Sequence, residues 1–163
     1  MVLVQDLADY TTGTLRGQWF TPTDYADAPE FADAVASFLA IAPGHEEYSI
    51  DDHEELPGAY VPRHMALNDL WTLCANVVEY GPAFAHWAGN VGAVDAVEDF
   101  QDRYRGLWDT PREYAQEFAD EIGGLVPMAW PYDCIDWEQA TRELMMDYAT
   151  FDATEGVYLF FTN

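Results

Sequence analysis

Residues 2–20 read VLVQDLADYTTGTLRGQWF, and this stretch decides the fold of the first part of the chain. Its two ends, Val2 to Val4 and Leu15 to Phe20, are rich in the apolar and aromatic residues that suit a pleated, half-buried strand. The run from Asp9 to Gly13 between them is typical of a turn. Two strands on either side of a turn predict an antiparallel hairpin at the start of the chain.

A helix and a third strand are expected directly after this hairpin. Asp27 is a candidate helix N-cap, with a proline two residues later and Glu30 three residues later, a pattern typical of a helix start. Apolar residues then recur at helical spacing from Phe31 to Leu39, and a Pro-Gly pair follows. A short third strand is predicted over residues 47–50. Residues 1–60 therefore predict a small β-β-α-β unit.

Two further units are expected after residue 60. In residues 61–106 the apolar spacing becomes helical, which predicts a central helical unit whose last helix runs from Ala93 to Tyr104. In residues 107–163 a capping box over residues 110–113 starts a helix whose apolar face includes Ile122. Another helix and a buried strand over residues 157–161 close the chain. The fold class is therefore predicted to be α+β, with a mixed α+β unit at the C-terminus.

The charge balance of the chain is extreme. Thirty acidic residues face six basic residues, all of them arginine, and the formal net charge is −24. The hydrophobic content of 50% and aromatic content of 15% are too high for a disordered chain, so the charge belongs to a folded protein. Repulsion among carboxylates keeps a protein soluble but destabilises its compact state. Nucleic acid, anionic membranes and acidic substrates are therefore excluded as partners, and a basic surface is favoured.

The acidic residues form rows. One row follows the spacing i, i+3, i+4, i+7 in the helix expected over residues 93–104, a second lies on the helix expected after residue 110, and a third group surrounds the third strand. Like charges at helical spacing cost about 0.2–0.5 kcal/mol per pair, and no lysine relieves them. The candidate partner-binding carboxylates are Glu46, Glu47, Asp51, Asp52, Glu54, Glu55, Asp95, Glu98, Asp99, Asp102, Glu113, Glu117, Asp120 and Glu121.

These rows predict that the protein imitates the phosphates of DNA. Consecutive positions of a row rise by about one helical turn, roughly 5 Å, which is similar in scale to the phosphate spacing of one strand. Duplex DNA carries one charge per about 1.7 Å of axis, so a net charge of −24 corresponds to about 40 Å of duplex. We interpret the protein as a decoy that occupies the site of a DNA-binding protein. An acidic surface adapted to high salt is the alternative explanation.

Motifs for catalysis and for cofactors are weak or missing. His45 and the two glutamates after it begin like a zinc-protease motif, but the second histidine is missing. Residues 51–55 are acidic enough to hold a divalent ion loosely, yet they lack the EF-hand spacing and its glycine. His45 and His53 are predicted to be loop or surface residues. We expect a protein that is not an enzyme and binds no metal or cofactor, with a salt-adapted enzyme or metal-binding module as the alternative.

The cysteines and the apolar segments predict a cytoplasmic protein. Cys74 and Cys134 form no C-x-x-C pair and are expected to be buried free thiols. The first ten residues contain no basic segment before an apolar run, so no signal peptide is expected. The chain also contains no run of about 18 apolar residues, the length of a membrane span.

Several segments resemble the ArdA family of antirestriction proteins, which are small acidic proteins carried by plasmids, conjugative transposons and phages. Tyr10, Gly13, Gly17 and Trp19 occur in the order seen in the opening hairpin of that family. The other similar segments are residues 46–52, residues 100–106, residues 113–115, residues 135–144 and residues 156–160. Together they cover nearly the whole length of the chain.

This resemblance implies a more specific function. Members of the family are similar to bent B-form DNA, so it implies an elongated, three-part α+β protomer that forms a homodimer through its C-terminal part. It also implies competitive inhibition of type I restriction-modification enzymes through their specificity and methyltransferase subunits. The aromatic-rich C-terminal third separately favours a dimer, because it is more apolar than one small unit needs. A decoy of another DNA-binding protein is the alternative.

Overall fold

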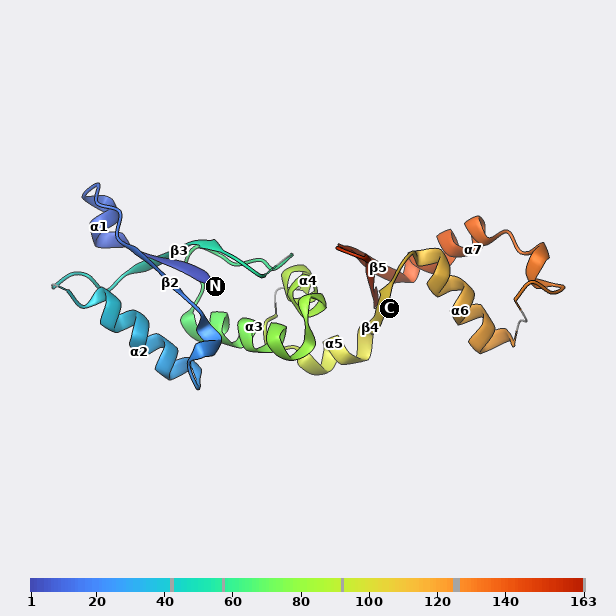
Figure 1. Ribbon diagram of the computed structural model, residues 1–163, viewed down its shortest axis with the longest axis horizontal. Helices are drawn as coiled ribbons and strands as arrows, with labels where there is room; N and C mark the ends of the chain where they lie inside the picture. The colour runs from blue at the N-terminus through green and yellow to red at the C-terminus, as the bar shows by residue number, and fades with distance from the viewer. Residues whose placement is uncertain (42, 57, 92, 125–126, 163) are drawn as a thin grey trace. The chain divides into compact units, whose positions relative to one another are not determined.

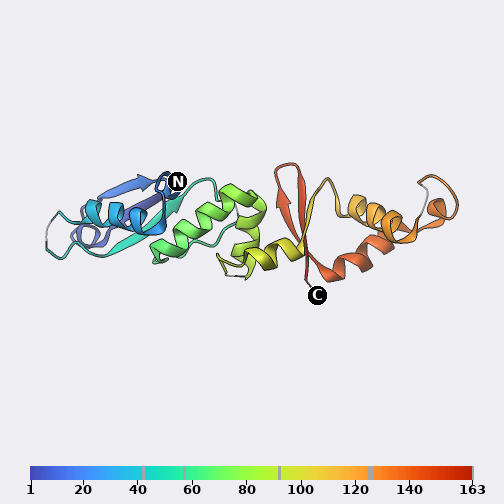
Figure 2. The same cartoon turned by 90° about the horizontal axis from the view of Figure 1, so that it is seen from below.

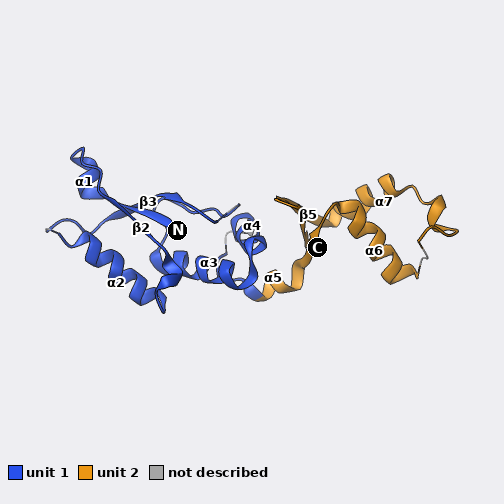
Figure 3. Ribbon diagram, viewed as in Figure 1, with its two compact units in different colours: residues 1–97 blue, residues 98–163 orange. Residues whose placement is uncertain are grey.

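The computed structural model describes residues 1–41, 43–56, 58–91, 93–124 and 127–162. The chain consists of two compact units, unit 1 over residues 1–97 and unit 2 over residues 98–163 (Figure 3). Each unit contains helices and one three-stranded antiparallel sheet, so the predicted α+β class is confirmed. The finer division into three parts stays a prediction.

Unit 1 is built on the predicted N-terminal hairpin. Its elements are β1 (Val2–Asp6), α1 (Leu7–Thr11), β2 (Gly17–Phe20), the short 3-10 helix η1 (Pro22–Asp24), α2 (Ala28–Leu39), β3 (Tyr48–His53), α3 (Leu67–Tyr80) and α4 (Pro82–Val91) (Figure 1). Strand β1 lies between β2 and β3 and pairs antiparallel with both. The hairpin is therefore confirmed, and β3 extends three residues beyond its predicted end at Ile50.

The connection between β1 and β2 contains the short helix α1, which we did not predict. The Asp6 carboxylate caps it, because Asp6 Oδ1 accepts hydrogen bonds from the amides of Ala8 at 2.8 Å and Asp9 at 3.2 Å. A capping side chain satisfies amides that have no partner inside the helix. The predicted cap of α2 is confirmed in the same way, since Asp27 Oδ1 accepts from the Glu30 amide at 2.9 Å.

The core of unit 1 lies between its sheet, α2 and α3. Alternate residues of β1 face the core, while α2 presents residues four apart along one side, as strand and helix periods require. In Figure 2 helix α2 lies across the strands of the sheet. The buried apolar cluster consists of Val2, Val4, Phe20, Phe31, Val35, Leu39, Ile50, Leu56, Leu70 and Cys74.

Unit 2 begins inside a helix. Its elements are α5 (Val97–Arg103), whose first residue closes unit 1, β4 (Tyr104–Trp108), α6 (Pro111–Gly123), η2 (Tyr132–Cys134), α7 (Trp137–Leu144), η3 (Met145–Asp147), β5 (Tyr148–Ala153) and β6 (Gly156–Phe161). The sheet has the order β4-β6-β5, so the predicted closing strand β6 is central. Strands β4 and β5 were not predicted. Helices α6 and α7 lie side by side in both views (Figures 1 and 2).

The helix predicted from Ala93 to Tyr104 is wrong at both ends. The Asn76 side chain donates to the carbonyl oxygen of Val94 at 2.7 Å, and the amide of Val97 donates to the Asp95 carbonyl at 2.9 Å, so the chain turns before α5 begins. At the other end Tyr104 pairs with Phe160 of β6 and starts β4. Tertiary hydrogen bonding overrides the helical pattern at each end.

Aromatic rings form the interior of unit 2. Phe160 is completely buried, and its ring lies 5.8 Å from that of Phe100, 5.2 Å from that of Tyr104 and 5.6 Å from that of Phe151, measured between centroids. Such pairs add about 0.5–1.5 kcal/mol each beyond the area they bury. Packing between aromatic rings therefore stabilises the core of unit 2.

Helix α6 begins at the predicted cap, but its C-terminal end is more exposed than predicted. The Thr110 hydroxyl accepts from the Glu113 amide at 3.2 Å, and Glu113 Oε2 accepts from the Asp109 amide at 3.2 Å. Tyr114 is buried, but Ile122 is 71% exposed. The expectation that Ile122 faces the core is therefore wrong, because the packed part of the helix ends before its last turn.

We expect Gly156→Ala to destabilise unit 2 by more than about 2 kcal/mol. Gly156 has φ of 116°, and a Cβ there would lie 2.2 Å from the Trp108 carbonyl oxygen, which belongs to the partner strand β4. Urea unfolding followed by tryptophan fluorescence measures the effect. Gly124→Ala is the control, because φ of 59° is also left-handed but a Cβ there meets nothing within 4 Å. We expect a cost of about 1 kcal/mol for the control, and equal costs would contradict the role of the close approach.

Candidate functional site

All of the carboxylates predicted from the sequence to bind a partner are exposed. They occupy three places: the surroundings of β3 in unit 1, the start and exposed side of α5, and one side of α6 in unit 2. Each place differs in how many of its charges are already neutralised by neighbouring groups.

Helix α6 carries the most open acidic row. Glu113, Glu117, Asp120 and Glu121 are exposed, while Tyr114 and Ala115 on the other side are buried. The Glu113 carboxylate takes part in the helix cap, as described above. Among the described residues, Glu117, Asp120 and Glu121 receive no side-chain hydrogen bond or ion pair. These charges therefore stay available to an outside cation.

The row predicted on the preceding helix is shorter than expected. Asp95 precedes α5, so only Glu98, Asp99 and Asp102 belong to the helix. No lysine relieves the row, but an arginine does, because Arg103 Nε donates to Asp99 Oδ1 at 2.8 Å from one turn away. Glu98 and Asp102 are the members of the helical part with no cationic partner among the described side chains.

One carboxylate of the acidic group around β3 is already paired inside the unit. The register of β3 against β1 shifts between Ile50 and Asp52, so Asp51 lies at an irregularity of the strand. Asp51 Oδ1 accepts from the Ser49 hydroxyl at 2.7 Å and from Arg63 Nη2 at 2.8 Å. Although partial burial acts to raise the pKa of Asp51, these two partners lower it overall. Glu46 and Glu47 before the strand, and Glu54 and Glu55 after it, are exposed.

A second set of charged residues is internal and was not predicted. The completely buried Asp6 carboxylate pairs through Oδ2 with Arg16 Nη2, while Arg16 Nε donates to Asp9 Oδ2 at 2.8 Å. His45 Nδ1 lies 2.8 Å from the same Asp6 oxygen. Arg16 Nη1 also donates to the carbonyl oxygen of Phe38, in the last turn of α2, at 2.6 Å. We call Asp6, Asp9, Arg16 and His45 the buried cluster.

A sequence signal for the buried cluster did exist. Asp6 follows Val2 and Val4 at strand spacing, which places a carboxylate on the core face, and a buried carboxylate requires a charged or hydrogen-bonding partner. Arg16 stands at the other end of the same hairpin. His45 was predicted to be a loop or surface residue; it does lie in the loop before β3, but its side chain is only 17% exposed.

The buried cluster also provides the one group of potential metal ligands found in the described part of the chain. One ligand atom each from Asp6, Asp9 and His45 lies within 4.8 Å of the others. The Arg16 guanidinium, however, is bound to both carboxylates and supplies the positive charge that a metal ion would bring. The cluster is therefore a structural ion pair, and residues 51–55 form no comparable group.

The two cysteines differ in their surroundings. Cys74 is buried in the core of unit 1, and burial raises the pKa of its thiol to about 11. Cys134 is exposed, so the prediction that both thiols are buried is wrong for this residue. It lies in η2, one turn long, which leaves its side chain outside the packed helices of unit 2.

The acidic rows and the fold agree with the comparison to known families. Residues 2–159 match the family model of ArdA, described as antirestriction protein. The chain belongs to the ArdA family. Membership implies an antirestriction function, and the ArdA family is not a known family of enzymes. No curated protein matches the chain. Within the described residues of this ArdA chain, no helix has the length and apolar character needed to cross a membrane.

We expect Asp6→Asn to lower the free energy of unfolding by about 2–4 kcal/mol at neutral pH, because Arg16 loses its buried counter-charge. Burial acts to raise the pKa of Asp6, but hydrogen bonds from His45, Arg16 and two amides lower it from 3.8 to about 2. Since the folded-state pKa is the lower one, this stabilisation is fully present above pH 3.8 and is lost as the pH falls through about 2.

Urea unfolding of both proteins across this acid range measures the difference. Asp33→Asn, at an exposed position of α2, is the control and should change stability by no more than about 0.5 kcal/mol. A difference in free energy of unfolding between the wild type and Asp6→Asn that stays constant down to pH 2 would contradict the lowered pKa of Asp6.

Proposed function

We propose that this protein inhibits type I restriction-modification enzymes by imitating B-form DNA and occupying their DNA-binding cleft. The observation that carries the proposal is the acidic row on α6, whose carboxylates are exposed and mostly free of partners among the described residues. The family match supports the antirestriction part of the proposal. Inhibition is competitive and needs no chemical step.

The charge density of α6 is close to that of one DNA strand. From Glu113 to Glu121 the helix rises by about 12 Å, at about 1.5 Å per residue, and carries four acidic positions of the row. One strand of DNA carries a charge every 3.4 Å or so, which gives about four in the same length. A basic cleft that binds one DNA strand therefore meets about as many negative charges along this helix as along the same length of that strand.

Four of the six arginines of the chain form ion pairs with carboxylates. Arg16, Arg63 and Arg103 pair with Asp6, Asp51 and Asp99, and Arg142 pairs with Glu138 on α7. Most of the thirty acidic residues therefore lack an arginine partner. Such a surface repels nucleic acid and attracts the lysines and arginines of a DNA-binding cleft. The proposed site of action is the cytoplasm, with the specificity and methyltransferase subunits as partners.

We also propose that the protein acts as a homodimer through unit 2. This unit exposes three large apolar side chains within residues 122–130: Ile122 at 71%, Met128 at 88% and Trp130 at 84%. These side chains lie close together in the sequence, and a large exposed apolar surface is a feature of protein interfaces. A dimer also doubles the imitated duplex to about 80 Å, based on one charge per 1.7 Å or so.

Transformation with unmodified plasmid tests the central claim. In a host with an active type I system, expression of the protein should restore transformation towards the level of a restriction-deficient host. No restoration, despite soluble protein, would overturn the proposal.

We expect Glu117→Gln, Asp120→Asn and Glu121→Gln together to weaken inhibition about tenfold or more, while each single change has an effect of less than about twofold, because exposed charge contacts are individually small. The control removes the same charge at exposed Glu143, Asp152 and Glu155, outside the predicted rows. Titration of a purified type I enzyme in a DNA cleavage assay measures both triple variants. Equal losses in the two would favour a general charge effect, and complete loss from one single change would favour a localised active site.

We expect Trp130→Ser to weaken self-association about tenfold, because large aromatic residues dominate the energy of interfaces. Sedimentation velocity at several protein concentrations measures the dimer. Tyr60→Ser is the matched control, since Tyr60 is a 69% exposed aromatic of unit 1. A wild-type protein that remains monomeric at high micromolar concentration would contradict the dimer.

A further inference from the structure

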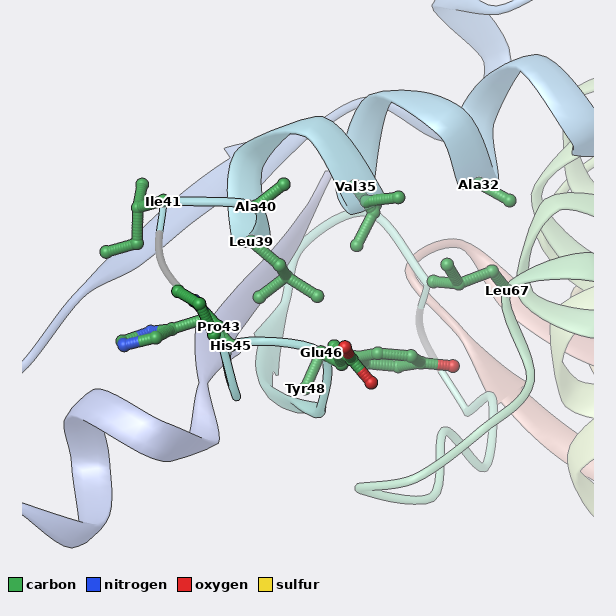
Figure 4. A pocket seen from close by; sticks show the side chains of 11 residues that line it. Ala32, Val35, Leu39, Ala40, Ile41, Pro43, His45, Glu46, Tyr48 and Leu67 are labelled. Atoms are coloured by element: carbon green, nitrogen blue, oxygen red, sulfur yellow. The ribbon is translucent and has the colours of Figure 1, made fainter.

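Unit 1 contains an apolar groove that the acidic rows do not explain. It has a volume of about 620 Å³ and lies between α2 and the segment that leads into β3. Val35 and Leu39 of α2 face Tyr48 across it, with Leu67 at one end and Ile41 at the other (Figure 4). This volume is comparable to that of a ligand pocket, and it is enough for one or two large apolar side chains.

A smaller and more polar hollow shares a wall with this groove. It has a volume of about 440 Å³ and is lined by Leu7, Glu46, Glu47, Tyr48 and His64. Glu46 and Tyr48 line both cavities. An apolar cavity and an acidic one therefore lie next to each other in the same unit.

The carboxylates at this wall are available to a cation. Glu46 and Glu47 are exposed, and their side chains make no hydrogen bond or ion pair with the described residues. The nearby carboxylates of Asp6 and Asp9 are already neutralised by Arg16. The charge at the wall therefore complements an arginine or lysine, while the groove complements an apolar side chain.

We propose that the two cavities together dock a basic segment of the target enzyme, which places an apolar side chain in the groove and an adjacent arginine or lysine against Glu46 and Glu47. This inference rests on the proposed function, because it assumes the enzyme as partner. It adds a contact that DNA does not offer, since a duplex presents no apolar groove of this size beside its phosphates. The protein thereby binds its target partly by shape.

The two parts of the site differ in their response to salt. Burial of an apolar side chain in the groove does not depend on ionic strength in the way that ion pairs do. The contacts to Glu46 and Glu47 are at the surface and are screened as salt rises. A substitution in the apolar groove and a substitution at Glu46 and Glu47 can therefore be distinguished by measuring the affinity for the enzyme at two salt concentrations.

Two substitutions at neighbouring positions of α2 test the groove. Ala36 is exposed and lines it, whereas Ser37 is exposed and does not. We expect Ala36→Phe to fill the groove and to raise the Kd for a purified type I methyltransferase about tenfold at both low and moderate salt. Ser37→Phe should change the Kd by less than about twofold. The double variant Glu46→Gln and Glu47→Gln should weaken binding mainly at low salt.

The possible results separate the two levels of the proposal. If the wild type binds and Ala36→Phe and Ser37→Phe bind equally well, the docking site is overturned and the proposed function stands. If Ala36→Phe alters sedimentation of the protein alone instead of enzyme binding, the groove holds a second copy of this chain and the inference is wrong. If the wild type does not bind the enzyme, both proposals fail. Thermal unfolding establishes that each variant is folded. If Ala36→Phe does not fold, Ile41→Ser replaces it, because Ile41 is an exposed apolar residue that lines the groove.

Discussion

The buried ion pair between Asp6 and Arg16 is the interaction on which the arrangement of unit 1 depends. It connects the end of β1 to the chain entering β2, and Arg16 also binds the last turn of α2 through the Phe38 carbonyl. His45 joins the segment before β3 to the same carboxylate. A buried charge that loses its partner costs several kcal/mol, so these segments must keep one arrangement. That arrangement also forms one wall of the apolar groove.

The distribution of arginine explains how a chain with so much negative charge stays folded. Arg16 pairs with the buried Asp6 and Arg63 pairs with Asp51 of β3, whereas Arg142 and Glu138 form an exposed pair on α7. The carboxylates without such partners lie at the surface, on helices and in the loops around β3, where water screens their repulsion. In unit 2 the aromatic core around Phe160 stabilises the fold against the remaining repulsion.

Local signals in the sequence predicted the elements that local interactions determine. The caps at Asp27 and Thr110 and the N-terminal hairpin were predictable because each depends on residues close in sequence. Strand β4 was missed because Tyr104 continues a helical pattern, and only its pairing with Phe160, far along the chain, makes it a strand. Asp95 was assigned to a helix for the same reason. Exposure of the acidic rows followed from composition, but their neutralisation at Asp51 and Asp99 depends on arginines brought near by folding.

The docking proposed for the groove beside α2 changes how a host enzyme can evolve resistance. A substitution that removes an arginine or lysine from the DNA-binding cleft weakens binding of an inhibitor that imitates phosphates. The same substitution also weakens binding of DNA, the enzyme's own substrate. An enzyme residue that docks in the apolar groove makes no contact with DNA, so it can be substituted without loss of DNA binding. Escape mutants should therefore accumulate at such a residue. The exposed lining of the groove, including Ala36 and Ile41, should diversify in response while the carboxylates interchange between aspartate and glutamate.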